Sequence, residues 1–195
     1  MGTRGLYGFR KGGVDKTTYN HWDSYPDYLG DAVAKLCTAH TPEQFSSFFD
    51  RITLVNEWDK PTPEQIAYCQ SHGWCDLTVS TRQAEDWYCL IRNLQGNMGE
   101  LSKAIKGDGE FIMTDSSEFI KDSLFCEYAY IINLDTNNLE FWEGFQRSPQ
   151  EGNRYGLDCD DDGYYPCRLA LTIPLNDTDT MSDAVELMNR ACGSD

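Results

Sequence analysis

The chain has 195 residues and a mass of 22.2 kDa, so one folded domain can bury about 70% of its extended surface without disulfides or metals. Its hydrophobic content of 40%, with 9 Phe, 11 Tyr and 5 Trp, excludes a disordered or low-complexity protein. The net charge of −16 disfavours direct nucleic-acid binding, because a phosphate backbone would be repelled.

The sequence contains no apolar run long enough for a signal peptide or a membrane span. We therefore expect a cytoplasmic protein that does not associate with membranes. The eight cysteines follow no short-spaced framework, as they would in a small secreted protein. We expect them to be reduced thiols.

The first elements predicted along the chain are a β-hairpin and a short helix. Residues 3–9 alternate as a strand does, Lys11-Gly12-Gly13 is a turn signal, and residues 14–20 can return as the partner strand. After a loop bracketed by Pro26 and Gly30, apolar residues at helical spacing predict a helix to about Ala39.

Two copies of Thr-Pro-Glu-Gln, at 41–44 and 62–65, predict the starts of two more helices. In each copy Thr can serve as the N-cap, Pro as the first helical residue and Gln as the third, which is the pattern of a capping box. The first helix is expected to include Ile52. The second is expected to end at His72, because Gly73 can adopt the left-handed conformation that terminates helices.

The middle of the chain is predicted to remain helical. A helix from Thr81 to about Gly96 is indicated by four apolar residues at helical spacing, namely Ala84, Trp87, Ile91 and Leu94. A further short helix is expected over 98–107.

The second half of the chain is predicted to be mainly β-structure. The expected strands are 111–113, 124–134, 139–145 and 164–175, followed by a closing helix over 182–191. We predict one α+β domain over residues 1–195, with its helical middle at about 29–107. Its sheet should be mainly antiparallel, built from the N-terminal and C-terminal hairpins and covered by several helices.

The segment Tyr19–Pro26 gathers polar and aromatic residues where a strand enters a loop, which is where binding sites often lie. His21, Asp23 and Ser24 cannot form a hydrolytic triad among themselves, because neighbours on an extended segment do not face one another. Both a structural turn and a ligand-contacting loop remain open. The predicted ligand-binding residues are Arg4, Arg10, Asn20, His21, Trp22, Asp23, Tyr25 and Arg154.

Two segments have residue types that suit metals. Asp158, Asp160 and Asp162 precede Gly163 as in the opening of a calcium loop, but Leu169 stands where the bidentate Glu belongs. A Ca²⁺ site and a solvated acidic loop are the alternatives there. Cys69, His72 and Cys75 supply only three zinc-type ligands at an unusual spacing, so packing is the preferred interpretation. We expect no other cofactor.

Three segments of the chain resemble a little-characterised family of proteins found in bacteriophages, bacteria and large DNA viruses. These segments are TRGLYGFR at 3–10, YNHWDSYPDYLG at 19–30 and YYPC at 164–167. The resemblance implies no activity. More distantly, the opening hairpin is similar in layout to N-terminal nucleophile hydrolases of the choloylglycine type, with Asn20 and Asp23 at the end of the second strand. It departs from them at the nucleophile, because Gly2 follows Met1 and Thr3 would need a free amine.

Three functions are compatible with these patterns. We favour a non-enzymatic binding or inhibitory protein, such as a phage-encoded anti-defence factor, that sequesters a small anionic or nucleotide-like ligand or a host protein. The alternatives are an acidic DNA mimic that inhibits a DNA-binding host protein, and an N-terminal nucleophile amidohydrolase. The sequence leaves open whether the protein forms a homo-oligomer.

Overall fold

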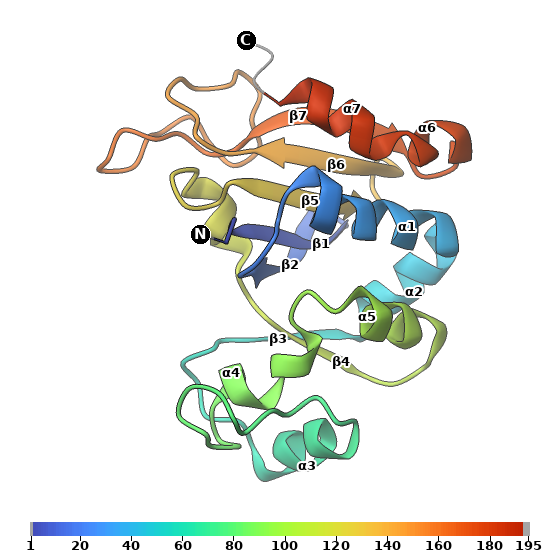
Figure 1. Ribbon diagram of the computed structural model, residues 1–195, viewed down its shortest axis with the longest axis vertical. Helices are drawn as coiled ribbons and strands as arrows, with labels where there is room; N and C mark the ends of the chain where they lie inside the picture. The colour runs from blue at the N-terminus through green and yellow to red at the C-terminus, as the bar shows by residue number, and fades with distance from the viewer. Residues whose placement is uncertain (1, 193–195) are drawn as a thin grey trace.

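A computed structural model describes residues 2–192 of the chain, and its architecture is α+β, as predicted (Figure 1). The main sheet has five strands in the order β2 (Val14–Asn20), β1 (Gly5–Lys11), β5 (Tyr128–Asn133), β6 (Asn138–Glu143) and β7 (Arg168–Pro174). All neighbours are antiparallel except β1 and β5, which are parallel. The N-terminal and C-terminal hairpins therefore join into one sheet through β1 and β5.

The turns of the two hairpins are fastened to each other. Gly12 and Gly13 have φ values of 61° and 77°, as a tight turn between antiparallel strands requires. Both of their N–H groups donate to the carboxylate of Asp135, at 2.6 and 2.9 Å, and Asp135 belongs to the turn after β5. This contact supports the parallel register of β1 and β5.

One face of the sheet packs against helices from both ends of the chain, with α1 in front of it in Figure 1. These helices are α1 (Asp31–Ala39), α2 (Pro42–Arg51), α6 (Thr178–Ser182) and α7 (Ala184–Ala191). The ring of Phe9 meets those of Phe45 and Phe48 of α2, at 5.8 and 5.4 Å between centroids. On the opposite face, Leu6, Ile131 and Trp142 form a smaller core under segments 117–126 and 147–167.

A second layer lies below the main sheet in Figure 1. It contains the parallel pair β3 (Ile52–Val55) and β4 (Phe111–Thr114), with α3 (Pro63–Ser71), α4 (Trp87–Leu90), the 3₁₀ turn η2 (Arg92–Leu94) and α5 (Met98–Lys106). Ring contacts lead from Phe48 to Phe111 and from Phe111 to Trp74, at 5.3 and 5.6 Å. The two layers therefore share one hydrophobic core.

The capping boxes of Thr41 with Gln44 and of Thr62 with Gln65 are both confirmed, and Gly73 has the expected positive φ of 70°. The predicted helix over 81–96 was wrong. Arg82 has a positive φ of 58°, and the carboxylate of Asp86 caps the N–H of Tyr88, so that α4 spans only Trp87–Leu90.

Other predicted boundaries shift for local reasons. Helix α2 ends at Arg51, because the next residues form a strand beside β4 that the sequence pattern did not indicate. Strand β5 starts at Tyr128, since the N–H of Cys126 donates to the carbonyl of Asp122 in a turn. Strand β7 starts only at Arg168, and the closing helix is divided into α6 and α7. Among residues 2–192, no helix is long and apolar enough to cross a bilayer.

His40 follows α1 and is buried against α5, where its Nε2 lies 2.8 Å from the hydroxyl of Ser102. Its Nδ1 has no hydrogen-bond partner among the residues described. Burial lowers the pKa of His40, the positive charge of Lys106 lowers it further, and Gln44 opposes the shift. The buried ring of His40 therefore favours its neutral form.

We expect His40 to make stability depend on pH. A folded pKa below the unfolded value of about 6.5 means that its contribution is complete above pH 6.5. It is lost as the pH falls through the folded pKa, because the unfolded chain binds the proton more readily. In urea denaturation between pH 7.5 and 5, His40→Gln should flatten this decline. His72→Gln, at an exposed histidine, should leave it unchanged; an equal effect of both variants would contradict the assignment.

Candidate functional site

The turn that follows β2 is held by the side chain of Asn20. Its Nδ2 donates to the carbonyl of Trp22 and to the hydroxyl of Ser24, the latter at 2.8 Å. The N–H of Ser24 donates to the carbonyl of Thr3, and its own carbonyl accepts from Tyr130 at 2.9 Å. Asn20 and Ser24 are both buried, so this part of the predicted binding loop has a structural role.

His21 and Trp22 lie on the outer side of the same turn. The Nδ1 of His21 is 2.9 Å from the hydroxyl of Tyr19, and its ring meets that of Trp22 edge-on at 4.3 Å between centroids. Trp22 is 56% exposed. The turn therefore combines an interior that fixes the backbone with a polar and aromatic exterior that can contact a ligand.

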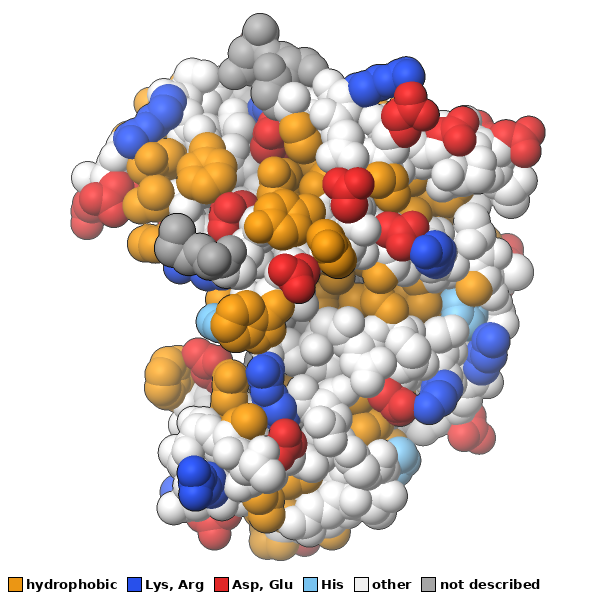
Figure 2. All heavy atoms as spheres, in the orientation of Figure 1, with side chains coloured by type: hydrophobic (Ala, Val, Ile, Leu, Met, Phe, Trp, Pro, Cys, Tyr) orange, Lys and Arg blue, Asp and Glu red, His pale blue; other side chains and the backbone are white. Residues whose placement is uncertain are grey.

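A groove runs from this turn between the main sheet and the second layer, and Figure 2 shows the molecule hollowed there at its left edge. We divide the groove into three neighbouring parts. The inner cavity, of about 130 Å³, lies between β1, β2, β4 and the α4–η2 segment. The amide arm, of about 540 Å³, is lined by His21, Trp22 and residues 92–98; the Arg4 arm, of about 520 Å³, is lined by Arg4 and residues 116–125.

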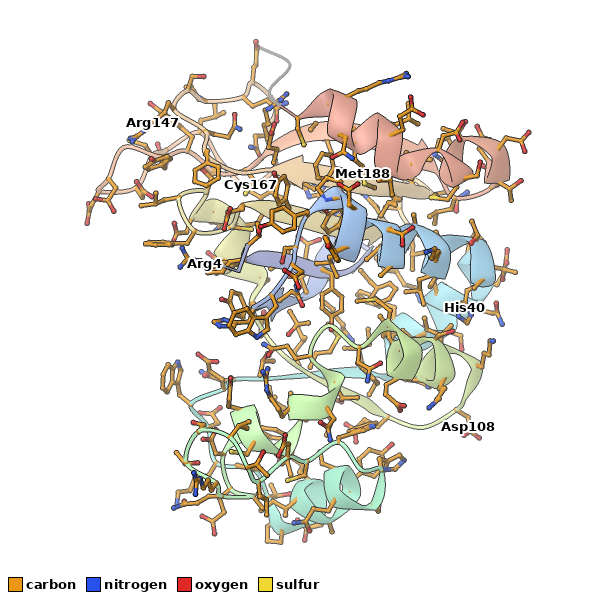
Figure 3. All side chains as sticks on the ribbon, in the orientation of Figure 1. Arg4, His40, Asp108, Arg147, Cys167 and Met188 are labelled. Atoms are coloured by element: carbon orange, nitrogen blue, oxygen red, sulfur yellow. The ribbon has the colours of Figure 1, made fainter. Side chains whose placement is uncertain are left out.

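The inner cavity shares lining residues with each arm, so the three parts lie next to one another. Tyr19 and Glu57 line both the inner cavity and the Arg4 arm, whereas Arg92 and Gln95 line both the inner cavity and the amide arm. Figure 3 shows Arg4 at the same edge of the molecule as the hollow in Figure 2. A ligand in the inner cavity can therefore contact residues that also line each arm.

The two walls of the groove meet at Gly96. Its N–H donates to the hydroxyl of Tyr7 on β1 at 3.3 Å, and Nε2 of the neighbouring Gln95 donates to the carbonyl of Tyr19 at 3.4 Å. Gly96 has a φ of 69°, and a Cβ there would lie 2.5 Å from Oδ1 of Asn20. Glycine is thus required both by the backbone conformation and by the close approach of the β2 turn.

Two arginines contribute positive charge to the groove. Arg4 lies over the ring of Phe125 at 4.4 Å, and Arg92 lies over that of Tyr88 at 5.0 Å. Arg92 also donates to the side-chain oxygen of Gln95. Within residues 2–192, no carboxylate lies at ion-pair distance from the guanidinium group of either arginine.

Acidic side chains also line the groove and limit its net charge: Glu57, Asp76 and Asp122. The pKa of Asp122 is raised, mainly by burial, although the nearby charge of Arg4 opposes the shift. The pKa of Asp76 is lowered, first by hydrogen bonds from Thr78 and then by Arg92. The positive charge of Arg92 therefore helps to keep Asp76 ionised in the amide arm of the groove.

The other predicted ligand contacts lie elsewhere. Asp23 is exposed with a φ of 48°, and Tyr25 packs beside Tyr28 and Tyr128; neither Asp23 nor Tyr25 lines the groove. Of the eight predicted residues, the structure therefore brings four to the groove, which are Arg4, Asn20, His21 and Trp22.

Arg10 and Arg154 converge on a separate cavity of about 300 Å³ at the other end of β1. Both arginines are paired there. Arg10 lies 2.9 Å from Asp15, while Arg154 makes two hydrogen bonds, of 2.8 and 2.6 Å, to the buried carboxylate of Glu140. Their charges are already neutralised, which makes this cavity a weaker anion site than the groove.

The segments considered for metals are occupied by local contacts. Oδ1 of Asp160 accepts from the N–H groups of Asp162 and Tyr164, at 3.0 and 2.8 Å, and thereby closes a turn. In the described part of the chain, no three His, Cys, Asp or Glu side chains are gathered as a metal site requires, whether around Asp158 or around Cys69. All eight cysteines are free thiols.

Sequence reasoning missed four residues that line the groove, namely Trp87, Tyr88, Arg92 and Gln95. Their segment was predicted as one helix, which would place Trp87 in the core and send Tyr88 and Arg92 to solvent. In the structure the helix stops at Leu90, and all four residues line the inner cavity. One signal in the sequence could have indicated a binding site here, namely two adjacent aromatic residues followed closely by an arginine and a glutamine.

We expect Gly96→Ala to reduce the free energy of unfolding by about 1–3 kcal/mol, because it strains the positive φ and crowds Asn20. The matched control is Gly152→Ala, since Gly152 also has a positive φ, of 77°, but nothing lies within 4 Å of its Cβ position. Urea denaturation should therefore show a larger loss for Gly96→Ala. Equal losses of stability in the two variants would mean that the contact with Asn20 does not limit the size of the residue at position 96.

The chain matches no family model, no curated protein and no solved structure.

Proposed function

We propose that this protein is a binding protein that holds a small, nucleotide-like organic anion in the groove without changing it chemically. The observation that carries the proposal is an apolar inner cavity that shares Arg92 with the amide arm and borders the arm lined by Arg4, both arginines lacking carboxylate partners within residues 2–192. An apolar pocket with a few converging polar groups is the usual form of a small-molecule site.

In a protein with so many acidic residues, arginines without a carboxylate partner indicate where an anion could bind. The chain has twice as many acidic as basic residues, 32 against 16, and ten ion pairs occur among residues 2–192. Arg4 and Arg92 nevertheless stack on aromatic rings and keep guanidinium N–H groups available. Guanidinium groups bind phosphate and carboxylate through charge-assisted hydrogen bonds, which supports an anionic ligand.

Aromatic faces in and around the groove support a ligand that also contains a ring. Tyr19, Tyr88 and Phe125 line it, and the exposed ring of Trp22 stands at the amide arm. The side-chain amides of Gln95, Asn93 and Asn97 also line the groove, but each NH2 group already donates to a backbone carbonyl, so ring recognition rests on the aromatic faces. These groups would bind a nucleotide-like molecule without requiring covalent chemistry.

The hydrolase alternative has less support. Thr3 is 3% exposed, its carbonyl accepts a hydrogen bond from Ser24, and it does not line the groove. The hydroxyls of Thr18 and Thr114 do line the inner cavity but are bonded to each other at 2.9 Å. Binding and retention therefore explain the groove better than nucleophilic catalysis does.

The DNA-mimic alternative requires acidic side chains in rows that imitate phosphates. On the face shown in Figure 2, the acidic groups are scattered among neutral and basic ones. We place the binding role in the cytoplasm, because the eight thiols are free and suit a reducing compartment.

The proposal is tested by isothermal titration of the protein with uridine 5′-monophosphate, adenosine 5′-monophosphate and inorganic phosphate. At least one nucleotide should bind, and Arg92→Gln should weaken that binding by about 10- to 100-fold, because a hydrogen bond to a charged group is lost. The control is Arg82→Gln, at an exposed arginine that does not line the groove. Failure of both nucleotides to bind, or equal losses in both variants, would contradict the proposal.

A further inference from the structure

A residue that lines the inner cavity carries a buried hydrogen-bond donor without an acceptor among the described residues. Trp87 is 1% exposed and lines the cavity, and its Nε1 has no hydrogen-bond partner among residues 2–192. Nearly all buried polar groups in native proteins are paired with protein or with an ordered molecule. An unpaired donor on a residue that lines a cavity is a group that an acceptor atom of a bound molecule would satisfy.

The other polar groups of the cavity also leave donors in excess. The hydroxyl oxygen of Tyr7 accepts from the N–H of Gly96, and no acceptor for its own O–H occurs in the described residues. Burial raises the pKa of Tyr7 to about 12, so the phenol keeps its proton at neutral pH. Thr18 and Thr114 share one hydrogen bond, which uses only one of their two hydroxyl protons. The complementary ligand atoms are therefore acceptors.

The size of the cavity limits what it can hold. Its volume of about 130 Å³ is close to the roughly 150 Å³ of an engineered protein cavity that binds benzene. Its walls come from β1, β2 and β4 and from the buried side chains of Trp87, Ile91 and Leu94. A single six-membered ring fills this space, whereas the second ring of a fused pair would have to extend beyond the inner cavity.

We propose that the inner cavity is a subsite for one unfused heterocyclic ring with carbonyl or ring-nitrogen acceptors, the class to which pyrimidine bases belong. This inference rests on the proposed function and specifies the ligand of the same groove. Arg92 and Gln95 line both the inner cavity and the amide arm, so they stand where the ring meets its substituent. The anionic group of a pyrimidine nucleotide then lies outside the cavity, beside Arg92.

Titration with uridine and adenosine 5′-monophosphate, combined with ¹H–¹⁵N NMR of the tryptophan indoles, tests the subsite. We expect the uridine nucleotide to bind at least about 10-fold more tightly and to shift the indole N–H signal of Trp87 downfield. Trp87→Phe, which keeps a ring but lacks the donor, should weaken uridine nucleotide binding by about 2- to 10-fold. Trp74→Phe, at a buried tryptophan that does not line the cavity, should leave the affinity unchanged.

The outcomes separate this inference from the proposed function. Equal or tighter binding of the adenosine nucleotide, or uridine nucleotide binding that leaves the Trp87 signal in place, would overturn the single-ring subsite and leave the groove as a binding site. Binding of neither nucleotide would overturn both. If Trp87→Phe does not fold, the titration of the unmodified protein still decides, because its five indole signals can be assigned by triple-resonance NMR.

Discussion

The close approach of Gly96 to Asn20 determines the shape of the groove. Asn20 fixes the turn after β2, and Gly96 brings the segment after η2 against that turn, where any side chain would collide with Asn20 Oδ1 at 2.5 Å. The N–H of Gly96 also donates to Tyr7. The main sheet and the second layer therefore touch at this junction, and the space beside it becomes the inner cavity and its two arms.

Two arginines that line the groove carry their charges outside the ion pairs formed by residues 2–192. Backbone contacts and ring contacts, rather than ion pairs, position Arg4 and Arg92. Their charges are therefore not neutralised by carboxylates of the described residues. Arg10 and Arg154 show the contrasting case, since each is paired with a carboxylate. Whether an arginine is paired depends on which side chains surround it in the fold. The unpaired arginines are the ones suited to bind an anion.

Local signals in the sequence predicted much of the fold but less of the site. The glycine turn at 12–13 and the two capping boxes act within a few residues, and all three are confirmed. Asn20, His21 and Trp22 were recognised as a loop at a strand end. Arg92 was missed, because apolar spacing at 84–94 resembles a helix, whereas the cap at Asp86 and the positive φ of Arg82 interrupt it. Strand β3 was also missed, because β4, with which it pairs, lies far along the chain.

The most direct measurement is a crystal structure of the protein grown with uridine 5′-monophosphate. The account requires the pyrimidine ring in the inner cavity, with an acceptor atom at hydrogen-bond distance from Nε1 of Trp87, and the phosphate beside Arg92. A nucleotide bound instead in the cavity of Arg10 and Arg154, or a groove left without nucleotide at saturating concentration, would contradict it.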